Sequence, residues 1–243
     1  MSDVEPICNE LGQPIGADVS QWRAPPPPSR VALQGRFSRV EPLDVAQHAG
    51  DLHAANSLDR EGRMWTYLSY GPFATASDYV EWARTRQDSA DPMFYAIVDT
   101  SHGRATGLAS YLRIDPEQGV CEVGHLAFSP LLQRRPAATE AMYLMMRRVF
   151  ELGYRRYEWK CNALNEPSCQ AALRLGFRFE GIFRQATVSK GRNRDTAWYS
   201  VIDAEWPALK EIYERWLAPD NFDDSGKQRE SLRSLMRASG RQA

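Results

Sequence analysis

The stretch that decides the interpretation of this chain is SPLLQRRPAATEA, residues 129–141. It reads as the end of a strand, a basic turn and the start of a long helix. Pro136 suits a first helical position, because its ring fixes φ and its missing N–H would have no helical partner there. The N–H groups that follow are expected to point out of the helix at its positive end, which favours a pyrophosphate. The residues expected to form this anion site are Arg134, Arg135, Ala137, Ala138 and Thr139.

Two more segments accompany this turn in order. Residues 120–128, VCEVGHLAF, have the pattern of a strand that carries a carboxylate, and residues 162–168, NALNEPS, lead into a short helix before Leu175-Gly176-Phe177. In this order the segments resemble the GNAT family of acyl-CoA-dependent N-acetyltransferases, and within it the ribosomal-protein N-terminal-acetyltransferase branch. The resemblance covers about residues 35–205.

One position departs from the family's pattern. The acyl-CoA loop of the family reads Gln/Arg-x-x-Gly-x-Gly/Ala, and residues 133–138 here read QRRPAA, with Pro136 in place of the first glycine. Because proline has no N–H, one backbone hydrogen bond to phosphate is expected to be lost.

The composition is that of an ordinary soluble enzyme, with 243 residues, 43% hydrophobic content and a net charge of −1. A charge this close to zero provides no field that would attract nucleic acid or an acidic membrane surface. The four cysteines and four histidines are scattered without metal-ligand spacing, so no metal is expected. No signal peptide or membrane-spanning apolar run is visible, which predicts a cytoplasmic protein.

The chain divides into three parts. Residues 1–34 are a proline-rich arm whose residues 25–28 form a polyproline II stretch, either a stiff arm lying on the domain or an SH3-like ligand. Residues 35–205 form the N-acetyltransferase-like domain. Residues 206–243 form an extension with an apolar stripe at helical spacing and a basic tail, and the tail is interpreted as a solvated helix face. The residues of the stripe and of the tail are Trp206, Leu209, Ile212, Tyr213, Trp216, Arg229, Arg233 and Arg237.

The periodicity predicts an α/β (α+β) fold with a mixed, mostly antiparallel central sheet flanked by helices. Strands are expected at residues 37–40, 94–98, 105–114, 120–128, 157–161, 179–188 and 197–203. Helices are expected at residues 44–57, 78–87, 136–152 and 167–175. The resemblance implies the GNAT acyl-CoA N-acyltransferase fold, in which the fourth and fifth strands, those of Glu122 and Trp159, splay apart.

The resemblance also implies how acetyl-CoA, the acyl donor, is held. Its pantetheine arm is expected in the splay, bonded to the backbone around Leu126, Ala127 and Phe128. Its pyrophosphate is expected on the turn from Gln133 to Thr139, with Asn165 and Ser168 on the other side. Alternatively, Asn165 is only the N-cap of the helix at Pro167, and Ser168 only a first-turn hydroxyl.

The implied reaction is direct attack of an amine on the thioester. The ammonium must first lose a proton, which requires a base. Glu122 is the candidate, because it lies eleven residues before Gln133, the spacing found in the histone-acetylating branch. The alternative is a structural glutamate bonded to an arginine on a neighbouring strand. Tyr199 and Ser168 are the candidate donors of a proton to the departing thiolate, and the sequence does not select between them.

The acceptor is expected at the aromatic-rich loop of residues 63–73, since aromatic faces can hold a cation. The candidate acceptor contacts are Trp65, Tyr67, Tyr70, His125 and Asp195. The alternatives are that the rings cap the core and that Asp195 pairs with a nearby arginine.

Together these features predict an N-acetyltransferase that moves an acetyl group from acetyl-CoA to a primary amine, either a protein N-terminus or a small molecule. A transferase of succinyl or other acyl groups and, because of Pro136, a non-catalytic acyl-CoA-binding module are the alternatives. Neither a nucleic acid nor a membrane is an expected partner, and both a monomer and a homodimer remain open.

Overall fold

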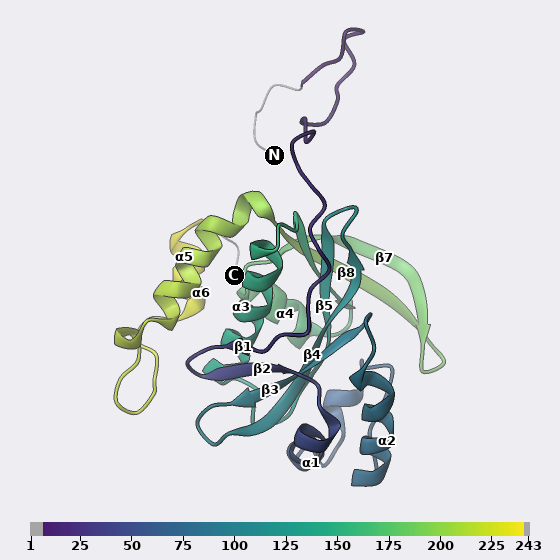
Figure 1. The fold of residues 1–243 in the computed structure, drawn as a ribbon, viewed down its shortest axis with the longest axis vertical. Coiled ribbons are helices and arrows are strands. Elements are labelled where there is room, and N and C mark those ends of the chain that lie inside the picture. Colours follow the sequence, from purple (N-terminus) through teal and green to yellow (C-terminus); the bar gives the residue numbers. More distant parts are fainter. Residues whose placement is uncertain (1–6, 241–243) are drawn as a thin grey trace.

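The computed structural model describes residues 7–240, which form one eight-stranded sheet in the order β1-β2-β3-β4-β5-β6-β8-β7 (Figure 1). Neighbouring strands are antiparallel except for β5 and β6, which run parallel. The predicted mixed, mostly antiparallel sheet is thus confirmed. The strands are β1 Leu33–Gln34, β2 Ser38–Pro42, β3 Met93–Asp99, β4 Arg104–Asp115, β5 Val120–Phe128, β6 Arg156–Asn162, β7 Arg178–Ser189 and β8 Arg192–Ile202.

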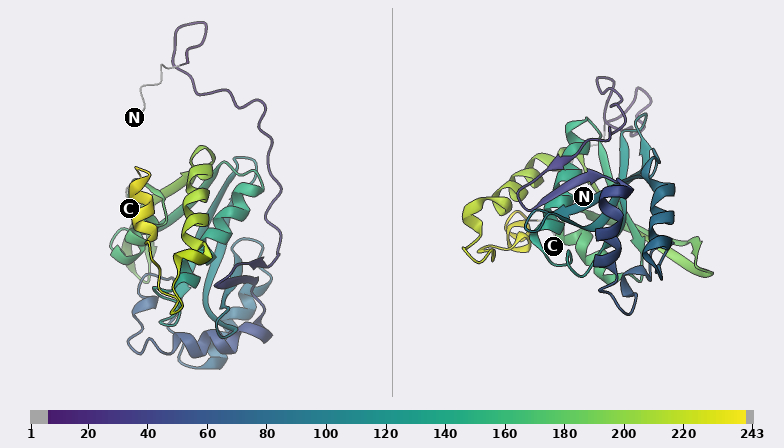
Figure 2. Two further views of the ribbon diagram at one scale, coloured as in Figure 1. Left: turned by 90° about the vertical axis from the view of Figure 1, so that its left-hand side faces the viewer. Right: turned by 60° about the horizontal axis from the view of Figure 1, so that its bottom comes forward.

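Helices cover both faces of this sheet (Figure 2). The helices α1 (Val45–Asn56) and α2 (Ala76–Gln87) pack on one face around Leu52, Phe94 and Leu108. The opposite face carries the larger core, beneath α3 (Pro136–Glu151), α4 (Glu166–Arg174), α5 (Trp206–Leu217) and α6 (Leu232–Ala238). Short 3-10 turns lie at η1 Arg63–Trp65, η2 Asp203–Glu205 and η3 Pro219–Asn221. Within residues 7–240, no helix is both long and apolar enough to cross a membrane.

Most helix ends lie where local chemistry places them. Asp44 caps α1 by accepting from the Gln47 N–H, and Gly153 follows α3 with a φ of 98° that favours glycine. The predicted start of α2 at residue 78 was wrong by two residues. Thr75 and Asp78 form a capping box that starts the helix earlier, so Asp78 is in the first turn rather than at the start.

Both terminal segments contact the domain. Pro25 and Pro28 are buried, and the Trp22 indole N–H donates to the Gly153 carbonyl over 3.2 Å. At the other end, α5 packs on α3, where Tyr213 stacks on Tyr143 at 5.1 Å. The expected basic helix of the tail was wrong at its start, because α6 begins at Leu232 and leaves Arg229 in the preceding loop.

A buried carboxylate joins α3 to the first strands. Glu140 accepts from the N–H groups of Arg36, Phe37 and Ser38 at 2.9, 2.6 and 2.7 Å, and from the Ser38 hydroxyl at 3.1 Å. Gly35 leaves room for this contact, since a Cβ there would lie 2.4 Å from the carboxylate. Four donors offset the cost of burying the charge.

Candidate active site

The parallel strands β5 and β6 separate after a short ladder. Pairing runs from Val120 opposite Arg156 to Val123 opposite Trp159, although β5 continues to Phe128 and β6 to Asn162. A β-bulge turns β5 away at this point, where its register with β4 slips and His125 has a φ of 51°. The two-residue β1 was not expected, so the splayed fourth and fifth strands of the prediction are β5 and β6. The predicted splay is confirmed.

The helix α3 follows β5 after the turn of residues 129–135, with Arg135 as N-cap and Pro136 in the first turn. The N–H groups of Ala137, Ala138 and Thr139 were expected to point out of the helix start, and this prediction was wrong for the last two. The Ala138 N–H donates to the Arg135 carbonyl over 3.1 Å, and the Thr139 N–H is the first that helix geometry pairs with the N-cap carbonyl. The Ala137 N–H is the one that stays at the open end of the helix. The Gln133 side chain is also engaged, as its amide donates to the Phe128 carbonyl over 2.8 Å.

One cation at this helix start was missed. The Arg174 guanidinium, from the end of α4, donates to the Thr139 hydroxyl over 3.1 Å. Burial lowers the pKa of Arg174, and the nearby Arg233 lowers it further. The run at residues 174–177, Arg-Leu-Gly-Phe, was interpreted as part of the family resemblance and as a helix end, and this role of Arg174 was not predicted.

The start of α4 lies beside the last paired residue of β6. Asn165 caps the helix by accepting from the Ser168 N–H over 3.3 Å, so the cap interpretation of Asn165 is confirmed. The Ser168 hydroxyl accepts from the Trp159 indole N–H over 3.1 Å. The Ser168 hydroxyl also makes a hydrogen bond with the Cys161 sulfur. Because a hydroxyl has one hydrogen, donation to a ligand would take the place of that bond.

Tyr199 lies deeper on the same face of the sheet. It pairs with Trp159 across β6 and β8, and its side chain is buried. Burial, followed by the contact with Cys169, raises the pKa of its phenol. Cys169 is itself 3.6 Å from the sulfur of Cys161. Tyr199 is therefore a neutral core phenol, whereas Ser168 is half-buried at a helix start.

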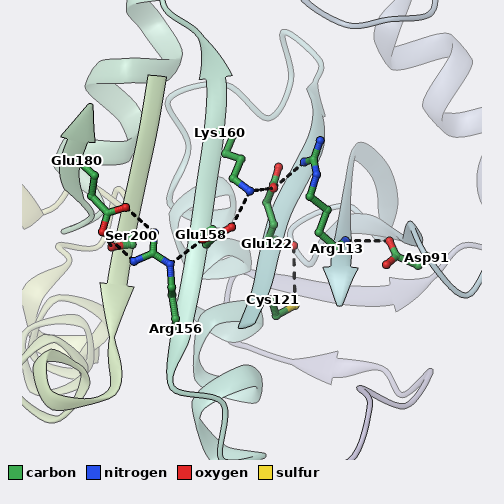
Figure 3. A network of polar contacts seen from close by, with 9 residues as sticks. All are labelled: Asp91, Arg113, Cys121, Glu122, Arg156, Glu158, Lys160, Glu180 and Ser200. Carbon is green, nitrogen blue, oxygen red and sulfur yellow. Dashed lines mark hydrogen bonds and ion pairs between the residues drawn. The ribbon is translucent and has the colours of Figure 1, made fainter. Parts of the chain in front are cut away.

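Glu122 lies on the opposite face of β5, since Cys121 and Val123 on either side of it belong to the core under α3. Its Oε2 atom is 2.6 Å from the Arg113 guanidinium and 3.0 Å from the Lys160 ammonium (Figure 3). Burial raises the pKa of Glu122, although both cations oppose the shift. An arginine on the neighbouring strand therefore does bind Glu122, as the structural alternative expected. Both of these contacts use Oε2, and Oε1 lies near Gly124 at the start of the splay.

This pair belongs to a polar row that crosses the sheet. Glu122, Glu158 and Ser200 are register partners on β5, β6 and β8. Lys160 also binds Glu158 over 2.7 Å, and Arg156 links Glu158 to Glu180 (Figure 3). Arg156 and Lys160 were not predicted as members of this row. The alternating charges of residues 156–160, Arg-Tyr-Glu-Trp-Lys, were the sequence signal, because they place both cations on one face of β6.

The aromatic loop of residues 63–73 faces this side of β5. Trp65 is 4% exposed and packs against Tyr70 and Phe73, so its ring caps the core. Tyr70 stacks on His125 at 5.7 Å between ring centres. Burial, followed by Arg86 and Arg113, lowers the pKa of His125 to about 4, so its ring is neutral at pH 7.

Two long-range contacts hold this loop in place. The Tyr67 hydroxyl donates to the Leu164 carbonyl over 3.0 Å, which joins the loop to the start of α4. The Lys190 ammonium, at the tip of the β7–β8 hairpin, donates to the carbonyls of Trp65 and Gly71 at 2.8 and 3.2 Å. Both contacts join segments far apart in the chain, and neither was predicted.

Asp195 takes part in the same hairpin. Its Oδ1 accepts from the Gln185 N–H over 2.7 Å and from the Asn193 amide over 2.9 Å. The Gln185 N–H is the main reason that the pKa of Asp195 is lowered. The carboxylate thus supports the bulge of β7, and among residues 7–240 no ion pair with an arginine was found for it.

The described part of the chain contains no group of three or more His, Cys, Asp or Glu side chains placed to hold a metal ion.

Residues 39–178 match the family model of the acetyltransferase (GNAT) domain. A GCN5-related N-acetyltransferase from Brucella melitensis is similar at 48% identity and a TM-score of 0.87, covering 90% of this chain and 100% of that one. A GNAT-family acetyltransferase from Chromobacterium violaceum shares 36% identity over 80% of this chain and 98% of that one, with a TM-score of 0.74.

A more distant structure shares the fold. It is the ribosomal L7/L12 α-N-protein acetyltransferase RimL in complex with coenzyme A, at 19% identity and a TM-score of 0.60, covering 71% of this chain and 98% of that one. The comparison with curated protein sequences found no match.

Proposed function

Because the chain belongs to the GNAT family of acetyltransferases, we propose that it moves the acetyl group of acetyl-CoA to a primary amine, on a protein N-terminus or a small molecule. One observation carries this proposal. The β5–β6 ladder ends at Val123 and Trp159, with Glu122 at that point on one face of the sheet and Ser168 on the other. An amine entering from one face and a thiol leaving on the other would meet a base and an acid on the appropriate sides.

The residues at the splay fit an acyl-CoA. Ala137 and Ala138 leave the start of α3 without bulky side chains, and Arg134, Arg135 and Arg174 supply positive charge beside it. Beyond Val123, β5 has no ladder to β6, so its backbone is available to an extended pantetheine amide. The groups that would hold the donor are the backbone of Leu126, Ala127 and Phe128, the turn from Gln133 to Thr139, Asn165 and Ser168.

The chemistry assigned to the protein is proton transfer and positioning. The free Oε1 of Glu122 would take the proton of the acceptor ammonium, directly or through a water. The amine nitrogen would then bond to the thioester carbonyl carbon while the carbon–sulfur bond breaks. The Ser168 hydroxyl would protonate the departing thiolate. We assign the acid to Ser168 rather than Tyr199, because the Tyr199 phenol is buried beside Cys169.

The acceptor wall would consist of Tyr67 and Tyr70 from the loop and His125 from β5, beside the splay. A neutral His125 does not repel an incoming ammonium, and the Tyr70 ring, which also contacts Trp82, holds the His125 ring in place. Trp65 supports this wall from the core, and Asp195 supports it through the hairpin.

Thermal melts with acetyl-CoA, CoA and succinyl-CoA test donor binding. At about a hundredfold excess over Kd, linkage predicts about 2.7 kcal/mol of stabilisation, or roughly 5–10 °C. Release of CoA is then measured with a peptide that has a free N-terminus, with the same peptide N-acetylated, and with small amines. We expect a shift with acetyl-CoA and turnover only with free amines. A larger shift with succinyl-CoA would overturn the donor assignment, and no shift with any donor would overturn the proposal.

A further inference from the structure

Residues 7–21 form an arm that stands away from the domain (Figures 1 and 2). Its tip is a small hairpin in which the Ile15 N–H donates to the Ile7 carbonyl over 2.8 Å and the Asn9 N–H to the Gln13 carbonyl over 3.0 Å. Cys8 and Pro14 are paired between these bonds. An isolated two-stranded hairpin is marginally stable in water, so this geometry calls for a surface to pack on.

The arm also exposes apolar side chains at a regular spacing of four residues. Ile7, Leu11, Ile15 and Val19 are 53%, 82%, 50% and 46% exposed. Single exposed apolar side chains are ordinary, but four of them in fifteen projecting residues mark a contact surface. The two charged residues of this arm, Glu10 and Asp18, are both acidic.

A second incomplete surface lies at the edge of the sheet. The strand β7 is last in the strand order, so its outer edge lacks a ladder partner within residues 7–240. No residue of β7 is buried, and its exposed apolar side chains are Phe179, Ile182, Phe183 and Val188. An edge of this kind pairs readily with another strand.

The charge of this edge is opposite to that of the arm. The β7–β8 hairpin contains four arginines and Lys190 against two acidic residues, Glu180 and Asp195. Glu180 is bound by Arg156 of β6, and Asp195 accepts from the hairpin's own amides. Arg178 pairs with Glu205, and Lys190 donates to backbone carbonyls of the loop of residues 63–73. The other three arginines, Arg184, Arg192 and Arg194, keep the hairpin positively charged, and the arm presents an apolar, negatively charged hairpin.

We propose that the arm of residues 7–21 docks on the β7–β8 edge of a second copy of this chain, so that two copies exchange arms. Each chain carries both surfaces, and a two-fold exchange covers both at once. Trp22 and the buried Pro25 and Pro28 of the polyproline stretch anchor the base of the arm, so the projecting part is held out toward a partner. This inference rests on the arm and the edge and is independent of acetyl transfer.

The molar mass in solution, from light scattering after size exclusion, gives the first test. We expect the full chain at twice its 27.6 kDa mass and a variant lacking residues 1–21 at the monomer mass. Val188→Asp, on the edge, should also give monomers, whereas Leu58→Asp, at a 53% exposed position on another surface, should leave the dimer intact. A monomeric full chain, or a dimer that survives the deletion, would overturn the proposal.

Disulfide mapping tests the contact itself. Cys8 is exposed on the arm, and the other three cysteines are buried. A chain with its native Cys8 is mixed with a Cys8→Ser/Val188→Cys chain under mild oxidation, and a Cys8→Ser/Leu58→Cys chain is the control. We expect the mixed cross-linked dimer with the first partner at several times the yield of the second. Equal yields would place the arm elsewhere and overturn the assignment of the edge.

Discussion

Glu122 binds both of its cations through one oxygen, Oε2, and its other oxygen lies near Gly124 at the splay. The same carboxylate can therefore be held in place and still accept a proton. Glu158 is its register partner and shares Lys160 with it, but it lies one strand farther along the row. The two glutamates form a matched pair for mutagenesis.

We expect Glu122→Gln to lower kcat by about 100-fold, within the usual range for loss of a general base, with little change in the Kd of acetyl-CoA. The raised pKa of Glu122 means that wild-type kcat should rise as pH increases through that pKa, because the base works deprotonated. Glu122→Gln should lack this rise. Glu158→Gln is the control and should keep both kcat and the pH profile; equal losses in the two variants would show that the row is only structural.

Ser168 and Tyr199 can be separated in the same way. We expect Ser168→Ala to lower kcat by roughly 10- to 100-fold, because the thiolate loses its proton donor. Tyr199→Phe should keep most of kcat, since it removes a hydroxyl that is buried beside Cys169. Steady-state kinetics with a saturating amine measure both, and a larger loss in Tyr199→Phe would reverse the assignment.

At the scale of elements, the start of α3 combines a proline with small residues. Pro136 has no N–H, and the Ala138 N–H donates to the Arg135 carbonyl, so the Ala137 N–H is the one at the open end of the helix. Arg174 reaches this helix start from α4 and adds a charge that the turn itself does not contain. The anion site is thus shared by two helices.

Pro136→Ala adds one N–H at the first helical position. If the pyrophosphate lies there, we expect acetyl-CoA to bind up to about tenfold more tightly, the value of one charge-assisted hydrogen bond. Titration calorimetry measures the affinity. Pro207→Ala, in the first turn of α5, is the matched control, because it has a similar effect on the unfolded chain without touching the site. An unchanged Kd in Pro136→Ala would place the phosphates away from this position.

Glu140 stabilises the packing of α3 against the first strands. Glu140→Gln replaces a carboxylate that accepts four hydrogen bonds, and an amide oxygen cannot satisfy them all. We expect a loss of about 3 kcal/mol and a fall in Tm of roughly 6–12 °C for a chain of this size. Glu151→Gln, exposed at the end of the same helix, should change Tm by less than about 2 °C.

At the scale of the whole molecule, the acceptor wall is assembled from segments far apart in the chain. Lys190 joins the β7–β8 hairpin to the loop of residues 63–73, and Tyr67 joins that loop to Leu164 before α4. These contacts enclose the side of the sheet that carries Glu122. Tyr67 connects this wall to the donor side at the start of α4, whereas Lys190 binds the loop itself.

Lys190→Met tests this separation. We expect a several-fold rise in KM for the acceptor amine with the Kd of acetyl-CoA unchanged, because only the acceptor wall loses its two hydrogen bonds. Lys210→Met, on α5, removes a surface lysine without touching either side of the site. A parallel loss of acetyl-CoA affinity in Lys190→Met would mean that the hairpin organises the whole site.

The features that could be predicted from the sequence are those made by neighbours in the chain. The strand–turn–helix around Pro136, the Asn165 cap and the order of strands and helices depend on residues within a few positions of each other. Their hydrogen bonds and apolar spacing are local, so they can be predicted from the types of neighbouring residues. The family resemblance rests on the same local motifs, and for that reason it identified the fold and the splay between β5 and β6.

What the sequence left open was the partner of each charge. The sequence allowed Glu122 to be either a general base or a structural glutamate. In the structure its Oε2 binds Arg113 and Lys160, and neither cation contacts Oε1. Arg174 at Thr139 and Lys190 at Trp65 join residues 35 and 125 positions apart. Such contacts have no signature in the linear order, because they exist only once the sheet brings distant segments to the same face. The chain's local chemistry therefore determined its elements and their order, and the packing of those elements decided which side chains share a site.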